Sequence, residues 1–156
     1  CNDRSISNFN GWNPDGGSTS SHLYFSGRNR AYSTYEPSLT CSRDIDSFTV
    51  SESNGNGDLD YPVGLLTSDE IMLAGGKYNV SNRAYYLYTG SNYWAGSPYG
   101  YGFNTSGANE LGVYSTGELL GSDVYNTYGV RPSISLAAGF TISGGDGTTS
   151  SPYIVQ

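Results

Sequence analysis

Charged residues are scarce in this chain, and their scarcity limits the chemistry that it can perform. Asp, Glu, Lys and Arg make up only 13% of its 156 residues, about half the usual fraction, and there is one histidine. The seven basic residues are scattered and form no stripe that could neutralise phosphates, and the net charge is −7. Nucleic acids and anionic membranes are therefore poor partners, and the acidity favours solubility.

Long hydrophobic runs and cysteines are also few. No stretch reaches the roughly 18 apolar residues of a transmembrane helix, so the sequence predicts no membrane contact for this segment. Two cysteines, Cys1 and Cys41, match no metal-binding spacing with the single histidine. In an oxidising compartment they would form a disulfide that closes a loop of about 40 residues and contributes roughly 3–4 kcal/mol. The alternative is two unrelated thiols.

Tyrosine and glycine are what the chain has in abundance, with 15 and 22 residues respectively. The length fits a single domain over residues 1–156, and the aromatic content argues against disorder. Tyr and Trp mixed with Ser, Asn and Gly, densest over residues 93–136, are typical of recognition surfaces and of extracellular proteins. An enzyme is disfavoured, because proton transfer and nucleophilic attack need titratable groups close together.

Short apolar and aromatic runs separated by Gly, Asn and Ser predict a β-rich, loop-heavy α+β domain with one or two short helices. Residues 2–30 are expected to be mostly irregular. One helix begins after Thr67, where Glu70 completes a capping box, and ends at Gly75. Pro132 should lie at a strand start or edge. Strands are expected at residues 22–25, 47–50, 85–88, 93–94, 111–114, 119–120, 124–125, 130–136, 141–143 and 153–155, with a hairpin turn at 115–118.

Candidates for catalysis and metal binding are weak. Residues 54–60 carry oxygen side chains on alternate positions, as calcium loops do, but the twelfth position is Leu65 where such a loop needs Glu; a loop of turn formers is the alternative. Asp69 and Glu70 suit a helix N-terminus better than a glycosidase pair. His22 has no nucleophile motif beside it, and Arg131 fits a structural role better than a ligand contact. We expect no cofactor.

Aromatic rings between residues 99 and 126 are the best candidates for ligand binding. Tyr99, Tyr101 and Phe103 alternate with glycines, which predicts an exposed loop that displays rings, whereas Trp94 and Tyr128 are expected in the core. A loose loop without a ligand is the alternative. The predicted binding residues are Tyr99, Tyr101, Phe103, Asn104, Ser106, Asn109, Tyr114, Tyr125 and Asn126.

Five separated segments, in order, carry a resemblance to a known family. Residues 58–70, 93–98, 128–132, 143–148 and 152–155 resemble the C-terminal domain of prepilin-like surface proteins of Gram-positive gut bacteria. That domain is similar to C-type-lectin folds of the formylglycine-generating-enzyme type. In such folds a Leu-Thr-acid segment opens a helix, a Trp strand enters the core, and a Gly-x-Arg-Pro strand closes the sheet.

The resemblance implies an extracellular, non-enzymatic binding or adhesion domain on a pilus or bacterial surface, with an unknown protein or glycan as ligand. Retroelement-diversified proteins of this fold vary between the Trp and Arg strands, which here would be residues 99–126. The oxidising enzymes' late cysteines are missing, and Glu36-Pro37-Ser38 departs from the calcium-lectin pattern, so neither activity is carried over. Two further hypotheses are a structural fibre subunit that packs through residues 153–155 and a glycan hydrolase with two carboxyl groups about 5–10 Å apart.

Overall fold

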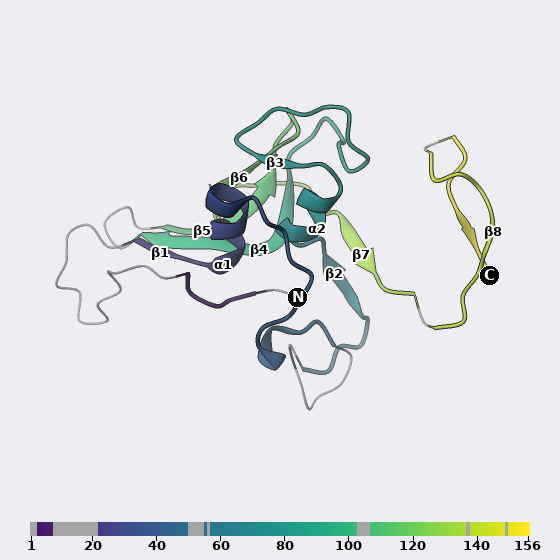
Figure 1. Ribbon diagram of the computed structural model, residues 1–156, viewed down its shortest axis with the longest axis horizontal. Helices are drawn as coiled ribbons and strands as arrows, with labels where there is room; N and C mark the ends of the chain where they lie inside the picture. Colours follow the sequence, from purple (N-terminus) through teal and green to yellow (C-terminus); the bar gives the residue numbers. More distant parts are fainter. Residues whose placement is uncertain are drawn as a thin grey trace.

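The computed structural model describes residues 3–7, 22–49, 55, 57–102, 107–136, 138–148 and 150–156. Over these residues the chain is mostly sheet with a few short helices, which confirms the predicted α+β class (Figure 1). In chain order the elements are β1 (His22–Tyr24), α1 (Ser26–Asn29), η1 (Arg30–Thr34), η2 (Asp44–Asp46), β2 (Val63–Leu65), α2 (Ser68–Leu73), β3 (Lys77–Tyr78), β4 (Tyr93–Gly102), β5 (Gly107–Val113), β6 (Glu118–Asp123), β7 (Pro132–Ile134), β8 (Ile142–Gly144) and β9 (Ile154–Val155).

A five-stranded sheet in the order β1-β4-β5-β6-β3 forms the centre of the molecule. Strands β4, β5 and β6 pair antiparallel, whereas the short β3 lies parallel to β6. The predicted hairpin turn between β5 and β6 is confirmed: Gly117 has φ +85°, and its N–H donates to the carbonyl of Tyr114. Glycine suits this turn because it adopts positive φ without steric strain.

Strand β4 is bent by a proline near its middle. Its register against β5 shifts between Trp94 and Pro98, and again between Pro98 and Gly100. Proline has no N–H to donate to a neighbouring strand, and such irregularities increase strand bending and twist. The bend curls the sheet, so that one of its faces wraps around the core.

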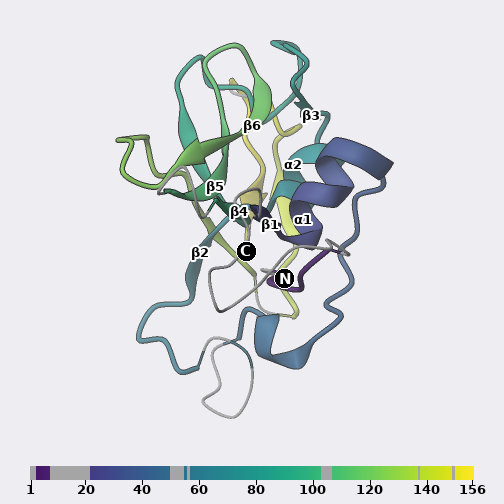
Figure 2. The same ribbon diagram turned by 90° about the vertical axis from the view of Figure 1, so that its left-hand side faces the viewer.

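The hydrophobic core lies between this sheet and the helices, and Figure 2 shows α1 and α2 on the same side of it. Alternation along β5 and β6 directs one set of side chains to the core. The fully buried apolar side chains are Ala31, Ile71, Leu111, Val113 and Leu119. The opposite face of β5 carries Glu110 and Gly112.

Helix α2 forms as its local signals predicted. The hydroxyl of Thr67 accepts from the backbone N–H of Glu70, and the Glu70 carboxylate accepts from the Thr67 N–H, so the capping box is complete. Gly75, with φ +110°, follows the end of the helix. A helix of about two turns is not stable by itself in water, and the buried side chain of Ile71 packs this helix against the core.

A network of ion pairs holds the helical segment formed by α1 and η1, which the sequence did not predict. The Arg30 guanidinium binds both carboxylate oxygens of Asp69, at 2.6 and 2.8 Å, and an oxygen of Asp3 at 2.7 Å. It thereby joins α1 and η1 to the start of α2 and to the N-terminal segment. The expectation of irregular structure over residues 2–30 is wrong for α1, whose support comes from partners far away in the chain.

Three expected strands do not form. Residues 85–88 are a turn that directs Tyr85 and Leu87 into the core, residues 124–125 belong to the turn after β6, and residues 47–49 carry no strand. Residue 50 lies outside the described part of the chain. Alternating apolar residues mark burial on one side, and a turn packed on the core gives the same alternation as a strand.

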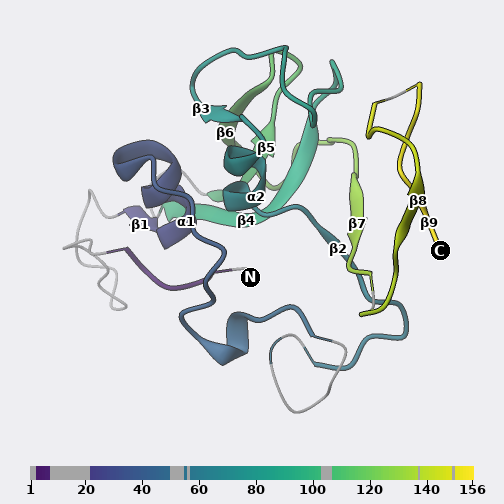
Figure 3. The ribbon, with the colours of Figure 1, turned by 45° about the vertical axis from the view of Figure 1, so that its right-hand side comes forward.

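Two small ribbons lie beside the main sheet. Strand β2 pairs with β7, which begins at Pro132 as predicted. Strands β8 and β9 form within one residue of the expected positions and pair antiparallel as a hairpin. Figures 1 and 3 show the β8–β9 hairpin set apart from the central sheet, with the β2–β7 ribbon between them. Among the described residues no helix is long and apolar enough to cross a membrane.

Candidate functional site

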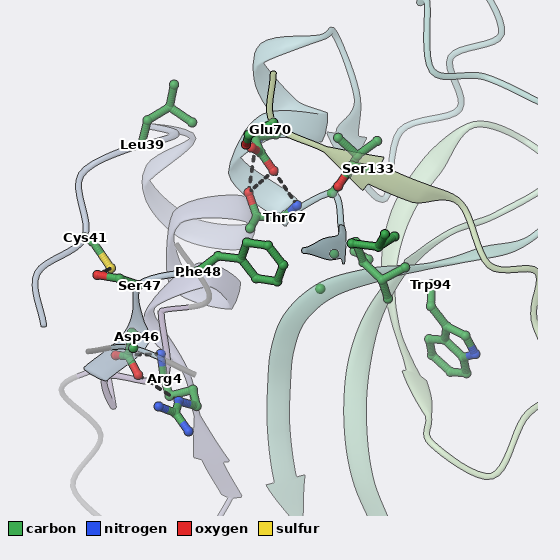
Figure 4. A pocket seen from close by; sticks show the side chains of 18 of the residues that line it. Arg4, Leu39, Cys41, Asp46, Ser47, Phe48, Thr67, Glu70, Trp94 and Ser133 are labelled. Carbon is green, nitrogen blue, oxygen red and sulfur yellow. Dashed lines mark hydrogen bonds and ion pairs between the residues drawn. The ribbon is translucent and has the colours of Figure 1, made fainter. Parts of the chain in front are cut away.

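A groove of about 1210 Å³ lies between the β2–β7 ribbon, the segment 39–48 and the outer side of β4 and β5 (Figure 4). Its walls come from parts of the chain that are far apart in sequence. The β2–β7 ribbon supplies one side and the coil that carries Phe48 another. Such a concave, mixed apolar and polar surface is the usual setting for ligand binding.

The walls of the groove are mainly apolar. The Phe48 ring lies against β2, so close to Gly64 that a Cβ at that position would be 3.1 Å from it. Glycine therefore allows the ring to rest on the strand. The main apolar lining residues are Leu39, Ile45, Phe48, Val63, Leu65 and Ile134. Several of these side chains are exposed, which leaves apolar surface available to a bound molecule.

Two carboxylates in the groove wall hold the local structure. Glu70 accepts from the N–H of Thr67 at 2.7 Å and from its hydroxyl at 2.8 Å. Asp46, whose side chain is fully buried, forms an ion pair with Arg4, with 2.7 Å between Nε and Oδ1. Asp46 engages both of its oxygens with Arg4, and Glu70 accepts both of its hydrogen bonds on Oε2, so each carboxylate has a structural partner.

Glu110 differs from these two acids. It lies on the outer face of β5, between Pro98 in β4 and Ser122 in β6. Within the described part of the chain its carboxylate has neither a hydrogen bond nor an ion pair. Burial raises the pKa of this carboxyl from 4.5 to about 7, because the charged form loses solvation without gaining a partner.

Tyr99, the first of the predicted binding residues, packs inside the molecule. The prediction of an exposed loop is wrong for residues 99–102, which form the end of β4. The Tyr99 ring is stacked with Tyr78, their hydroxyls are 3.1 Å apart, and it meets Tyr24 edge to face. Glycines make room for these rings: a Cβ on Gly121 in β6 would be 2.7 Å from the Tyr99 ring, and one on Gly100 would be 2.9 Å from the Tyr24 ring.

The other predicted residues that the structure describes fall into two groups. Asp123 joins the first group, since it accepts from Asn109 at 2.7 Å and from the Tyr125 hydroxyl at 2.8 Å. Tyr125 is 77% exposed, and Tyr101 is 40% exposed at the edge of this region. Phe103, Asn104 and Ser106 lie outside the described residues.

The second group surrounds Tyr128. The Tyr128 ring stacks on Trp94 with centroids 4.4 Å apart, and Tyr114 meets it edge to face. The side-chain amide of Asn126 donates to the Ser122 hydroxyl, which donates to Tyr128. Trp94 and Tyr128, expected in the core, are half-buried on the outer face of the sheet. The predicted residues that the structure describes are therefore not gathered into one surface.

The remaining candidates from the sequence are Arg131, the two cysteines and the possible calcium loop at residues 54–60. Arg131 donates to the carbonyl of Leu87 at 2.7 Å, and its guanidinium lies 5.6 Å from the centre of the Tyr93 ring. Cys41 is disulfide-bonded, while Cys1 lies outside the described residues. Over the described ranges no three His, Cys, Asp or Glu residues cluster as a metal site, and residues 54–60 are described only in part.

Sequence reasoning missed the groove and a second feature, a stacked cation. The guanidinium of Arg28 lies 4.1 Å from the ring centre of Tyr24 and 4.0 Å from that of Tyr32. Leu111 is buried in the core, and side chains alternate along a strand, so the sequence could have placed Glu110 on the outer face of β5. Nothing local to Glu110 indicates that β2 and β7 cover that face.

Comparisons of the chain with protein-family models, with curated proteins and with solved structures found no match.

Proposed function

We propose that this chain is an extracellular, non-enzymatic binding domain displayed on a pilus or another bacterial surface structure, and that the groove holds its ligand. The groove itself is the observation that carries the proposal. It combines a volume of about 1210 Å³ with exposed apolar side chains and neutral hydroxyls. These are features of a site that holds a molecule through burial and a few polar contacts.

The arrangement of the acids supports binding rather than catalysis. Hydrolysis of a glycan needs one carboxyl group as acid and a second as base or nucleophile, both free to act on the bond. In the groove wall, Glu70 caps α2 and Asp46 holds Arg4, so Glu110 is the one carboxylate there without a structural partner among the described residues.

A C-type-lectin-like fold is part of the proposal and is supported by three features. The capped helix α2 opens at Thr67, the strand carrying Trp94 is an interior strand of the sheet, and the segment before Pro132 runs beside that strand. This last contact includes the Trp94 N–H, which donates to the carbonyl of Gly129 at 3.0 Å. The resemblance implies the same three elements in the same order.

The test is a glycan and protein array probed with the purified 156-residue chain and two variants. Phe48→Ala removes an apolar wall of the groove, so a ligand held there should be lost. Tyr86→Ala removes an aromatic ring that is 73% exposed and does not line the groove, and it should bind as wild type does. Equal binding by all three proteins would place the ligand elsewhere, and turnover of an arrayed compound would contradict a non-enzymatic role.

The outer residues Tyr101, Tyr125 and Asn126 form the exposed part of the surface predicted from sequence. Val124, the neighbour of Tyr125 in sequence, lines the groove, whereas Tyr101, Tyr125 and Asn126 do not. The double variant Tyr101→Ala, Tyr125→Ala separates the two locations. Loss of binding in this variant, with binding retained in Phe48→Ala, would favour the predicted surface over the groove.

A structural fibre subunit is the second candidate, and the β8–β9 hairpin favours it. An isolated two-stranded hairpin is marginally stable in water, yet Ile142, Tyr153 and Ile154 are each more than half exposed. A neighbouring subunit could cover these side chains by pairing with a strand edge. Sedimentation velocity at increasing concentration should show association that Ile154→Asp abolishes; a monomer at all concentrations would argue against this role for the chain alone.

A further inference from the structure

Glu110 lies in the groove without a counter-ion among the residues that the structure describes. Its strand neighbours at the same level are Pro98 and Ser122, and neither is charged. The other charged groups that line the groove are Arg4, Asp46 and Glu70. Arg4 is paired with Asp46, so the groove has an excess of negative charge.

The Glu110 carboxylate is half-buried but not sealed in. Neither of its oxygens is among the fully buried polar atoms that lack a partner in the described structure, so a molecule in the groove can reach them. An ionised carboxylate in a largely apolar setting is unfavourable unless it is paired, and burial raises its pKa to about 7. A cation brought by a ligand would supply the missing pair.

We propose that the groove binds a peptide segment in which a lysine lies between apolar side chains, and that the lysine ammonium pairs with Glu110. This inference rests on the proposed binding function and names its ligand class. Aliphatic walls such as Leu65 and Ile134 suit apolar side chains. A lysine stem packs along an apolar wall while its charged end reaches a polar group. The net charge of −7 also attracts cationic segments.

The matched variants are Glu110→Gln and Glu36→Gln. Both replace a carboxylate by a neutral amide of the same shape and change the net charge equally. Glu36 is exposed and does not line the groove. Glutamine retains the size of Glu110 and removes the buried charge, so the Glu110→Gln variant should fold at least as well as wild type. Loss of binding in it would therefore not reflect unfolding.

The probe is an array of pentapeptides with a central lysine and flanks varied over Ala, Val, Leu and Phe, beside the same peptides with central norleucine. At about pH 8.5, where Glu110 is ionised, wild type and Glu36→Gln should bind a subset of the lysine peptides. Glu110→Gln should bind them at least about tenfold more weakly, as expected for a lost charge-assisted contact. Bound peptide should also lower the pKa of Glu110 followed by carboxyl ¹³C NMR.

Three results would overturn the inference. Equal affinity of the lysine and norleucine peptides would mean that the groove recognises apolar side chains alone. Equal affinity of wild type and Glu110→Gln, or no binding of any peptide, would remove Glu110 as the partner of a lysine. If the glycan and protein array still finds a ligand that Phe48→Ala loses, the proposed function stands and only the ligand class is wrong.

Discussion

Replacing Glu110 by glutamine should stabilise the folded protein in alkaline solution and leave it unchanged in acid. The carboxyl group titrates near 4.5 when the chain is unfolded and near 7 in the folded state, because burial disfavours its charged form. Between these values the folded protein holds a proton that the unfolded chain has released. The contribution of Glu110 to the stability of the wild type therefore falls as pH rises from about 4.5 to about 7 and then levels off.

The size of the effect follows from the two pKa values. Each tenfold difference in proton binding is worth about 1.4 kcal/mol, so the full difference amounts to about 3 kcal/mol. Glu110 is half-buried, and solvent reduces this figure, so we expect the glutamine variant to be more stable by about 1–3 kcal/mol above about pH 8. Near pH 4.5 the two proteins should unfold at the same urea concentration.

Urea unfolding of the oxidised protein, followed by tryptophan fluorescence and by circular dichroism from about pH 4.5 to about 9, measures this difference. Glu36→Gln serves as control, and its stability should follow that of the wild type at every pH. A difference between wild type and the Glu110→Gln variant that is constant with pH, or that favours the wild type in alkali, would refute the reasoning. It would mean that Glu110 has a partner in solution.

Three further predictions concern the framework. Asp69→Asn should lower the free energy of unfolding by about 3 kcal/mol, because it leaves the partly buried Arg30 guanidinium without its main partner. The exposed Asp58→Asn should not, and similar urea midpoints for both variants would contradict the network. Tyr99→Ala should lower the free energy of unfolding by about 2–3 kcal/mol through lost packing, while Tyr125→Ala should leave the melting temperature unchanged. A larger loss of stability in Tyr125→Ala than in Tyr99→Ala would contradict the packing of Tyr99 described above. Peptide mapping without reductant should find Cys41 joined to the other cysteine; two free thiols would contradict the disulfide.

The elements that could be predicted from sequence are those specified by neighbouring residues. The capping box at Thr67 and Glu70, and the hairpin turn at Gly117, form within a few residues of chain, and both are confirmed. Burial on one side of a segment is harder to interpret. Tyr85 and Leu87 alternate with exposed residues as a strand would, but tertiary packing makes them a turn that enters the core.

The glycines around Tyr99 mislead for a physical reason. Alternation of rings and glycines indicates a loose loop, whereas here Gly121 provides the space in which the Tyr99 ring lies on the sheet. Small residues opposite large ones are as typical of close packing as of flexibility. Local sequence does not distinguish the two cases, since the ring and the glycine that accommodates it lie on different strands.

The groove could not be predicted, because it is made of long-range neighbours. Phe48 comes from a coil, Glu110 from the middle of β5, and Ile134 from β7. Each is ordinary in its own segment. What makes Glu110 unusual is the ribbon that covers its strand face, and a single sequence holds no local sign of that cover.

The disulfide at Cys41 links the shape of the groove to the redox state of the chain. Cys41 lies in the groove wall, on the same stretch of chain as Leu39 and Phe48. A covalent bond there restrains one side of the groove. Reduction of the disulfide would remove this restraint, whereas the central sheet does not depend on it. A chain with reduced thiols would thus have a looser groove wall than the oxidised chain.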